Sequence, residues 1–318
     1  MNLLPYKQAS EIPAESAGLT HWLVEGLWSD QAVGILGGEP KCCKSFLALD
    51  LAVSVAAGVA CLRRYPVRHP GRVLLFPAED ALGIVRQRLQ GICAAAGVGF
   101  ESLPLEVITV PVLRLDTEAD RQRLAKTVEA LRPRLLILDP MIRLHRLDEN
   151  DASQIAVLLS HLRELQRRFQ TAVVLVHHAR KDSNGSRPGQ ALRGSSELHG
   201  WGDSNLYMRR RGQRLTLTTE HRAAPSIDDI PLQLTQSGAV VSLAVAAASA
   251  DETPPQNSAL ERVRQTLQQI GEPASVSRIR KLCGMRMASV CESLAQLVQQ
   301  GIVAQDIRGY RLDPPKAA

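Results

Sequence analysis

An eight-residue stretch near the N-terminus has the residue types and the position expected of a phosphate-binding turn. GEPKCCKS, residues 38–45, follows the apolar run 33–37 and opens a helix-like pattern over 45–57. In such a turn, backbone N–H groups and the helix dipole favour phosphate oxygens. Lys44 would reach the β and γ phosphates, and the Ser45 hydroxyl would bind Mg²⁺. The candidate nucleotide-contacting residues are Gly38, Glu39, Pro40, Lys41, Cys42, Cys43, Lys44, Ser45 and Phe46.

Cys43 stands where this pattern, the P-loop, has glycine. Glycine is usual there because the backbone must bend close to phosphate without a Cβ clash. Cysteine is small, so we expect it to fit, with a cost in affinity or turnover. For Cys42 and Cys43 together, two packed thiols or a redox switch remain as alternatives. A strand-to-helix turn without a ligand is the purely structural alternative for the whole stretch.

Carboxylates follow two further apolar runs. LLFPAED ends at Glu79 and Asp80, and RLLILDP contains Asp139. The carboxyl ends of parallel strands form the ligand-binding edge of a sheet. We therefore expect Glu79 to act as general base on water and Asp139 to contact Mg²⁺ through water. The structural alternatives are an acidic pair at a helix N-terminus and a turn aspartate before Pro140.

Two histidines, His177 and His178, end the run AVVLVHHARK. A histidine at this edge could sense the γ-phosphate and relay its loss to the Gly-, Ser- and Arg-rich loop that follows. The alternative is a packed or solvated residue at a strand end. Adjacent strand residues face opposite ways, so we do not expect the pair to bind a metal.

The elements that must position these residues alternate in type. Apolar runs occupy 33–37, 72–76, 105–110, 134–139 and 172–177, and helix-like patterns occupy 45–57, 81–96, 117–131 and 153–169. This alternation predicts an α/β fold with a mainly parallel sheet covered on both faces. The runs at 206–208, 215–219, 232–235 and 240–245 predict an antiparallel extension.

Composition divides the chain into four parts. Residues 1–30 form a lead-in, 31–245 the α/β domain, 246–257 a linker and 258–318 a small C-terminal domain. The last part reads as three helices, 260–270, 275–284 and 288–301, followed by a hairpin over 302–312. Ser275 and Gly284 would cap the second helix. This is the order of a winged helix-turn-helix.

Charge in the C-terminal domain suggests a nucleic-acid partner. Residues 257–318 hold 9 Lys and Arg against 5 Asp and Glu. Arg286 and Ser289 would face a major groove, and Arg308 and Arg311 on the wing would meet phosphates. The alternative is a winged helix that contacts protein.

Whole-chain composition excludes several classes of protein. The 318 residues are 45% hydrophobic and 22% charged, which excludes wholesale disorder and a coiled coil. No uncharged apolar run reaches the roughly 18–20 residues of a membrane span, and the N-terminus lacks a secretory pattern. Six scattered cysteines indicate free thiols, so we expect a cytoplasmic protein.

Residues from about 20 to 245 resemble the RecA-fold ATPases of the RepA type, the hexameric plasmid replication helicases and their relatives. The matching blocks are GEPKCCKSFLALDLA, LLFPAED, LLILDPMIRLHRLDENDAS, VVLVHHARK and ALRGSS. The resemblance implies a RecA-like P-loop ATPase that uses ATP and Mg²⁺. It implies that Asp139 is the Walker B carboxylate, Glu79 the catalytic base and His178 the phosphate sensor.

The resemblance also implies an arginine supplied by a neighbouring subunit. Extension of the match from RGSS without a gap places Asp203 at the expected position. Arg193 and the run that starts with Arg209 are the available substitutes. A solvated hairpin turn is the alternative for the run.

We therefore expect a homo-oligomeric, hexameric ATPase that acts on DNA. Single-stranded DNA would contact Arg180, Lys181 and Arg187 in a central channel, and duplex DNA would contact the winged helix. The first hypothesis is a translocating helicase in replication of a plasmid or mobile element, favoured by the basic loop. The second, favoured by Cys43 and the missing arginine, is a DNA-binding ATP switch with slow hydrolysis. An inactive nucleotide-binding oligomer is the third.

Overall fold

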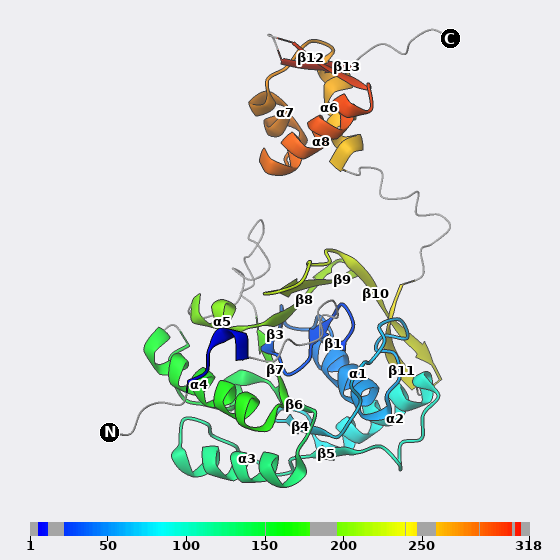
Figure 1. Cartoon of the computed structure of the whole chain (residues 1–318). Helices are drawn as coiled ribbons and strands as arrows, with labels where there is room; N and C mark the ends of the chain where they lie inside the picture. The colour runs from blue at the N-terminus through cyan, green and yellow to red at the C-terminus, as the bar shows by residue number, and fades with distance from the viewer. Residues whose placement is uncertain are drawn as a thin grey trace. The chain divides into compact units, whose positions relative to one another are not determined.

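The computed structural model describes residues 6–11, 22–149, 151–178, 196–238, 240–246, 259–285, 287–306 and 309–312. The chain divides into two compact units, one within residues 1–246 and one within 247–318 (Figure 1). None of the helices in the described ranges combines the length and the apolar character that a bilayer crossing requires.

A nine-stranded sheet with the order β11-β10-β9-β8-β3-β7-β6-β4-β5 forms the centre of the first unit (Figure 1). The parallel strands are β3 (Val33–Gly38), β4 (Val73–Pro77), β5 (Leu105–Val107), β6 (Leu135–Asp139), β7 (Ala172–His178) and β8 (Ser204–Arg211). The antiparallel strands are β9 (Arg214–His221), β10 (Ile230–Ser237) and β11 (Val240–Val245). The predicted α/β fold with an antiparallel extension is confirmed.

The structure corrects the predicted place of β8. Leu206 and Met208 of β8 pair in parallel register with Leu36 and Gly38 of β3, so this strand belongs to the parallel part. The antiparallel extension begins one strand later, at β9. As a result, the carboxyl end of β8 lies at the same edge of the sheet as the turn that follows β3.

Helices cover both faces of the sheet, α1 (Lys44–Ala57) and α2 (Leu82–Ala96) on one side and α3 (Glu118–Leu131) and α4 (Ala152–Phe169) on the other (Figure 1). Side chains alternate along each strand, so Leu135 and Ile137 of β6 pack in the core beneath α1 and α2. Leu136 and Leu138 pack in the core beneath α3 and α4. Burial on both faces explains why this strand reads as an unbroken apolar run.

Helix ends follow their local sequence signals. Asp151 precedes α4, and its side chain accepts a hydrogen bond from the backbone N–H of Ser153 at 2.9 Å. Helices α1 and α2 end at Gly58 and Gly97, both left-handed, with φ of 70° and 68°. A short helix, α5 (Ser196–Trp201), and a 3₁₀ turn, η2 (Met141–Arg143), complete the elements around the sheet.

Residues 22–30, which the sequence analysis set apart as a lead-in, pack into the core of the first unit. The strands β1 (Trp22–Val24) and β2 (Trp28–Ser29) form an antiparallel hairpin. Leu23 and Trp28 are buried, and Nε1 of Trp28 donates to the carbonyl of Ala32 at 3.3 Å. The apolar core therefore starts before residue 31. The 3₁₀ turn η1 (Ala9–Glu11) precedes this hairpin in the chain.

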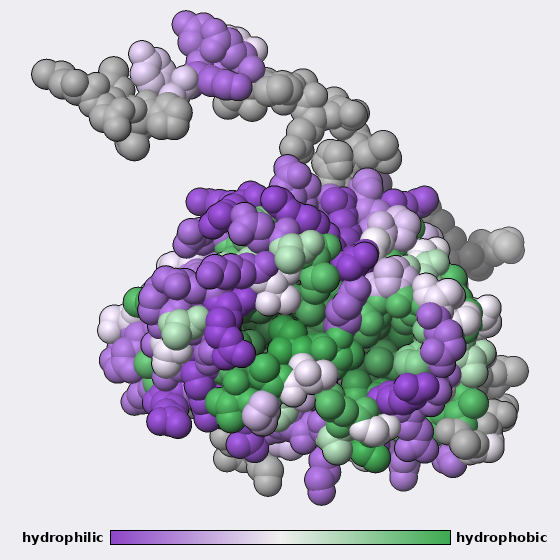
Figure 2. Space-filling model, turned by 90° about the horizontal axis from the view of Figure 1, so that it is seen from below, coloured by the Kyte–Doolittle hydropathy of each residue, from purple (hydrophilic) through white to green (hydrophobic). Residues whose placement is uncertain are grey.

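An apolar groove of about 230 Å³ lies between α2 and the edge strand β5. It is lined by Leu82, Val85, Arg86, Leu89, Phe100, Leu103, Leu105, Val107 and Thr109. Figure 2 views the molecule from the side of α3 and β5 and shows apolar side chains gathered on that face. On the far side of α2, Gly91 permits close packing, because a Cβ there would lie 3.3 Å from the backbone N and O of Val241 in β11.

The second unit contains α6 (Ala259–Ile270), α7 (Val276–Cys283), α8 (Met287–Gln299) and the hairpin β12 (Val303–Asp306) and β13 (Gly309–Leu312). Ser275 caps α7 by accepting from the N–H of Arg278 at 3.4 Å, and Gly284 ends it with φ of 64°, as predicted. Ala274 and Tyr310 exchange two backbone hydrogen bonds of 2.9 Å, which tie the hairpin to the segment between α6 and α7.

Candidate functional site

Residues 38–45 connect β3 to α1 in a tight turn at the carboxyl edge of the sheet. Lys41 and Cys43 adopt left-handed conformations, with φ of 63° and 66°. Cys43 directly precedes α1 and makes no side-chain cap, so the first N–H groups of this helix keep their capacity to bind an anion. Position 38 requires glycine because the backbone of β8 approaches it closely. A Cβ there would lie 2.5 Å from the carbonyl oxygen of Met208.

Lys44 is buried and directs its ammonium group into this turn. Nζ donates to the carbonyl oxygens of Gly38 at 2.9 Å and Glu39 at 2.8 Å. Burial lowers the pKa of the Lys44 ammonium, and the nearby Cys42 and Asp139 act in the opposite direction. The turn therefore holds a cation at the point where the P-loop pattern predicts one.

Three carboxylates lie next to this cation. Asp139 ends β6 in register opposite Pro77 of β4, and Glu79 and Asp80 follow β4. Burial and the negative charges of Asp80 and Glu79 together raise the pKa of Asp139 to about 6, against a hydrogen bond from Ser45. A half-buried carboxylate that bonds a hydroxyl and lies near like charge suits a divalent cation, which takes oxygen ligands.

Two arginines contact these carboxylates, a role that the sequence did not predict for either of them. Nε of Arg143, in η2, donates to Oε1 of Glu79 at 2.9 Å. Arg88 of α2 forms an ion pair with Asp80, and its guanidinium carbon lies 5.1 Å from the ring centre of Phe46. Arg88 follows Asp80 by about two helical turns, which is the sequence signal that could have revealed this pair.

One cavity of about 280 Å³ brings most of the predicted groups together. It is lined by Lys41, Cys42, Cys43, Lys44, Ser45, Phe46, Pro77, Glu79, Asp80, Arg88, Asp139 and His178. His178 ends β7 in register opposite Gly38. Gly38, Glu39 and Pro40 form the first half of the turn outside this lining.

The adjacent thiols have different surroundings. Cys42 is buried in the core beneath α1 and α2, and burial raises the pKa of its thiol. Cys43 is half-buried and lines the cavity. All six cysteines are free, so Cys42 and Cys43 are two packed thiols in this state.

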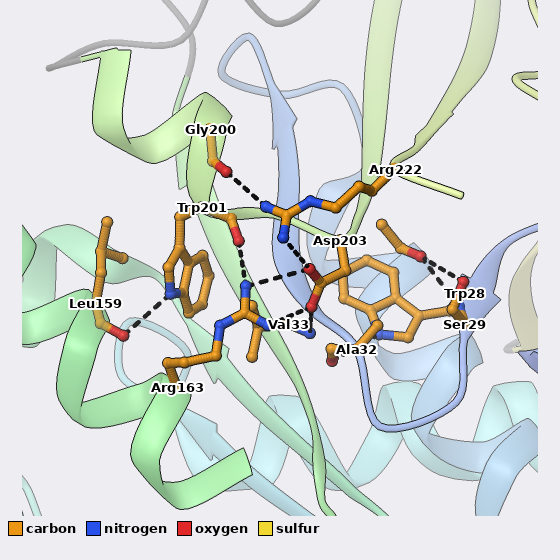
Figure 3. Close-up of polar contacts among 11 residues, drawn as sticks. Trp28, Ser29, Ala32, Val33, Leu159, Arg163, Gly200, Trp201, Asp203 and Arg222 are labelled. Carbon is orange, nitrogen blue, oxygen red and sulfur yellow. Dashed lines mark hydrogen bonds and ion pairs between the residues drawn. The ribbon is translucent and has the colours of Figure 1, made fainter. Parts of the chain in front are cut away.

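A second charged cluster lies at the amino edge of the sheet, around Asp203 (Figure 3). The Asp203 carboxylate accepts from the N–H of Val33 at 3.3 Å and pairs with Arg163 and Arg222. Nη2 of Arg163 also donates to the carbonyl of Trp201 at 2.6 Å. Asp203 therefore links the start of β3 to α4, and Arg163 extends this link to the end of α5.

The resemblance to RepA-type ATPases, extended from RGSS without a gap, expects an arginine finger at position 203. The aspartate found there has a structural role in this cluster. Asp203 precedes β8 and bonds the first residue of β3, whereas Lys44 follows the last residue of β3, so the two residues lie at opposite edges of the sheet.

A larger hollow of about 690 Å³ lies beside the cluster, between α4 and α5. The Arg163 and Arg168 side chains in its lining are paired with Asp203 and Glu129, so the smaller cavity is the better candidate site.

The arginine run on β8 divides between the two faces of the sheet. Met208 packs beneath α1 and α2, and Tyr207 packs on the opposite side. Alternation therefore places Arg210 on the α1 face and Arg209 on the other. Nη2 of Arg210 lies 3.2 Å from Sγ of Cys43. The structure thus brings Arg210, the middle residue of the run Arg209–Arg211, to the turn of its own chain. The prediction for Arg209 and this run concerned a neighbouring subunit and stays a prediction.

Several predicted residues lie outside the described part of the chain: Arg180, Lys181, Arg187, Arg193, Arg286 and Arg308. Of the remaining predicted DNA contacts, Ser289 is half-buried near the start of α8, and Arg311 is exposed on β13.

Several solved structures have folds similar to that of the first unit. The "ATPase Domain of G40P" is 14% identical, with a TM-score of 0.53 over 68% of this chain and 86% of that one. A RadB recombinase is 16% identical, with a TM-score of 0.50 over 67% and 90% of the two chains. A DnaB-like replicative helicase is 13% identical, with a TM-score of 0.51 over 67% and 57%.

These likenesses establish a RecA-like fold for the first unit. The sequence itself matches a family model described as an AAA domain, AAA_25, over residues 11–184. That range contains the turn at 38–45, both carboxylate-bearing strand ends and His178. The chain belongs to the AAA_25 family of AAA domains.

Proposed function

We propose that this protein is an oligomeric ATPase that acts on DNA, as a RepA-like helicase or motor in replication of a plasmid or mobile element. The observation that carries the proposal is the single cavity shared by Lys44, Ser45, Glu79, Asp139 and His178. These side chains come from a turn and the ends of three different strands. Together they supply a phosphate-binding cation, oxygen ligands for Mg²⁺, a base and a γ-phosphate contact.

Each group has a distinct role in this proposal. The turn N–H groups and Lys44 bind the phosphates, and Ser45 with Asp139 would hold Mg²⁺. The described residues contain no group of three or more His, Cys, Asp or Glu side chains arranged to hold a metal, so water and phosphate oxygens would complete the shell. Bound Mg²⁺ neutralises phosphate charge.

Glu79 is the group placed to accept a proton from the attacking water. Its carboxylate lines the cavity, and Arg143 holds Oε1 at 2.9 Å, which leaves the second oxygen for water. His178, at the end of β7, would respond to loss of the γ-phosphate and pass the change to residues 179–195. Arg193 or Arg209 of a neighbouring copy would complete the charge stabilisation.

DNA would bind at two places. Arg180, Lys181 and Arg187 would line a channel in a hexamer and hold single-stranded DNA. The second unit would bind duplex as a winged helix, with Arg286 and Ser289 at the groove and Arg308 and Arg311 on phosphates. Its element order and the exposed position of Arg311 on β13 support this assignment.

The decisive experiment measures Mg²⁺-dependent ATP hydrolysis by the full chain with and without single-stranded DNA, beside size analysis with nucleotide. We expect hydrolysis that single-stranded DNA stimulates, and a nucleotide-dependent oligomer. Absence of hydrolysis under both conditions would contradict the proposal.

A second candidate function, a DNA-binding ATP switch that loads or regulates other factors, is favoured by two observations. Cys43 replaces a glycine in the turn, and Asp203 is engaged in a structural cluster where the family match expects an arginine. Strand displacement on a forked substrate separates the candidates. Slow hydrolysis without displacement would support the switch and exclude the helicase.

Duplex binding by the second unit is tested with Arg311→Ala and, as a control in the same unit, Arg264→Ala, whose side chain pairs with Glu261 on α6. Loss of one phosphate contact should make the slope of log K against log salt less negative by about 0.9. We expect this change for Arg311→Ala alone. A chain truncated after Ala250 that binds duplex as tightly as the full chain would assign the second unit to protein contacts.

A further inference from the structure

The end of β8 carries an arginine to the phosphate-binding turn of the same chain. Met208 lies in parallel register opposite Gly38, so Arg210, still within β8, lies two residues past the end of β3 and next to the turn that follows it. Its position in the strand alternation places it on the α1 face. The guanidinium reaches the turn, where Nη2 lies 3.2 Å from Sγ of Cys43.

This contact is one that a phosphate ligand can replace. A thiol sulfur is a weak acceptor, whereas a guanidinium carries five donors in a fork that matches phosphate oxygens. Arg210 is exposed, so a guanidinium held by Cys43 keeps most of its donors for other partners. A carboxylate in place of the thiol would pair with the arginine and compete directly with phosphate.

The charges of the cavity leave a role for a further cation once nucleotide is bound. The lining holds three acidic side chains, Asp139, Glu79 and Asp80, and the lysines Lys41 and Lys44. Arg88, in that lining, is paired with Asp80. A bound nucleoside triphosphate adds further negative charge to this site, and a cation that approaches from β8 would offset it.

We propose that Arg210 binds the phosphates of the nucleotide held by its own subunit, and that Cys43 is its partner when the site is empty. The inference rests on the proposed ATP binding and adds a residue to it. It differs from an arginine finger, because Arg210 and Lys44 belong to the same chain and would act on the same nucleotide.

The test is equilibrium titration of the full chain with a fluorescent ATP analogue and Mg²⁺. Arg210→Ala should weaken affinity about tenfold or more, as expected for loss of a hydrogen bond to a charged group. Arg210→Lys should recover part of the affinity, because it keeps the charge but loses the fork. The matched control is Arg214→Ala, an exposed residue of β9 on the face opposite to that of Leu215, which should stay within about twofold of wild type.

Equal affinities for Arg210→Ala and wild type would overturn this inference and leave the proposed ATPase intact. Absence of analogue binding by the wild-type chain would overturn both. An equimolar mixture of Lys44→Ala and Arg210→Ala distinguishes the two geometries. If Arg210 acted on a neighbour, mixed assemblies would contain complete sites, so hydrolysis above the sum of the separate variants would refute action within one chain. We expect no such recovery.

Discussion

The two edges of the central sheet both gather charged side chains, but they arrange them in opposite ways. At the carboxyl edge, Glu79, Asp80 and Asp139 line the same cavity of about 280 Å³ as Lys44. At the amino edge, the single carboxylate of Asp203 lies between two arginines and accepts a backbone N–H. The charged groups of the carboxyl edge border an open cavity, although Glu79 and Asp80 also pair with Arg143 and Arg88. Those of the amino edge are closed against one another and against backbone groups.

The difference shows how a functional cluster can be told from a structural one. Burial, together with the negative charges of Asp80 and Glu79, raises the pKa of Asp139 to about 6, and a bound divalent cation would offset this cost. The Asp203 carboxylate, in contrast, has hydrogen-bond partners from β3, from α4 and from Arg222 after β9. Mutations at the first edge should therefore affect chemistry, and mutations at the second should affect stability.

The largest expected effect is that of Lys44→Ala at the carboxyl edge. It removes the buried cation of the turn, so ATP hydrolysis should fall by about a thousandfold or more and nucleotide affinity should weaken. Hydrolysis is measured by phosphate release, with Lys126→Ala on the exposed side of α3 as control. Wild-type turnover by the Lys44 variant would remove the P-loop assignment.

Glu79→Gln should retain ATP binding and lose hydrolysis by about a hundredfold or more, because the amide cannot accept the proton of the attacking water. Analogue titration and phosphate release on the same preparation separate the two effects. Glu101→Gln, on the exposed surface, is the control. Loss of binding together with hydrolysis would show that Glu79 holds the structure of the site.

Asp203→Ala, at the amino edge, should lower the stability of the fold and leave ATP hydrolysis nearly unchanged. It leaves Arg163, Arg222 and the N–H of Val33 without the carboxylate, at a cost of about 2 kcal/mol after allowance for partial exposure. Denaturant unfolding should show this loss, while hydrolysis per folded molecule changes little. Glu129→Ala removes an exposed pair with Arg168 and should cost under about 0.5 kcal/mol. A specific loss of turnover at unchanged stability would make Asp203 a functional residue.

The smallest effect belongs to Cys43→Gly. Glycine relieves a left-handed conformation with φ of 66°, so stability should rise by about 0.5–1 kcal/mol, and nucleotide affinity should be equal or tighter. Gln170→Gly, with φ of 54° at the end of α4, relieves similar strain away from the site and should leave affinity unchanged. A collapse of nucleotide binding in the Cys43 variant alone would show that this thiol is required by the turn.

The sequence predicted the fold and most of the carboxyl edge for one physical reason. Lys44, Glu79, Asp139 and His178 each follow an apolar run, and the carboxyl ends of parallel strands meet at one edge. Motif and strand end together were enough to place them without any knowledge of distant contacts.

The missed contacts depend on long-range pairing. Arg163 and Asp203 are 40 residues apart, and neither lies in a motif. Arg210 reaches Cys43 because β8 runs parallel to β3 in a particular register, which apolar periodicity does not specify. The short run at 206–208 therefore indicated a strand but not its partner.

Lys44 already donates hydrogen bonds to two backbone carbonyl oxygens, so a nucleotide bound at the proposed site would exchange places with these acceptors. Nζ is held by Gly38 and Glu39 at 2.9 and 2.8 Å, so an incoming phosphate must replace backbone oxygens that are already well placed. A small monovalent anion that takes one donor gains little over the carbonyl it displaces. A polyphosphate accepts hydrogen bonds from several N–H groups of the turn at once, and these offset the loss of the carbonyl contacts. Under the proposed function, the turn would therefore favour a polyphosphate over chloride and other simple anions. After product release, Lys44 would return to the carbonyl oxygens of Gly38 and Glu39, which would keep the turn in shape for the next nucleotide.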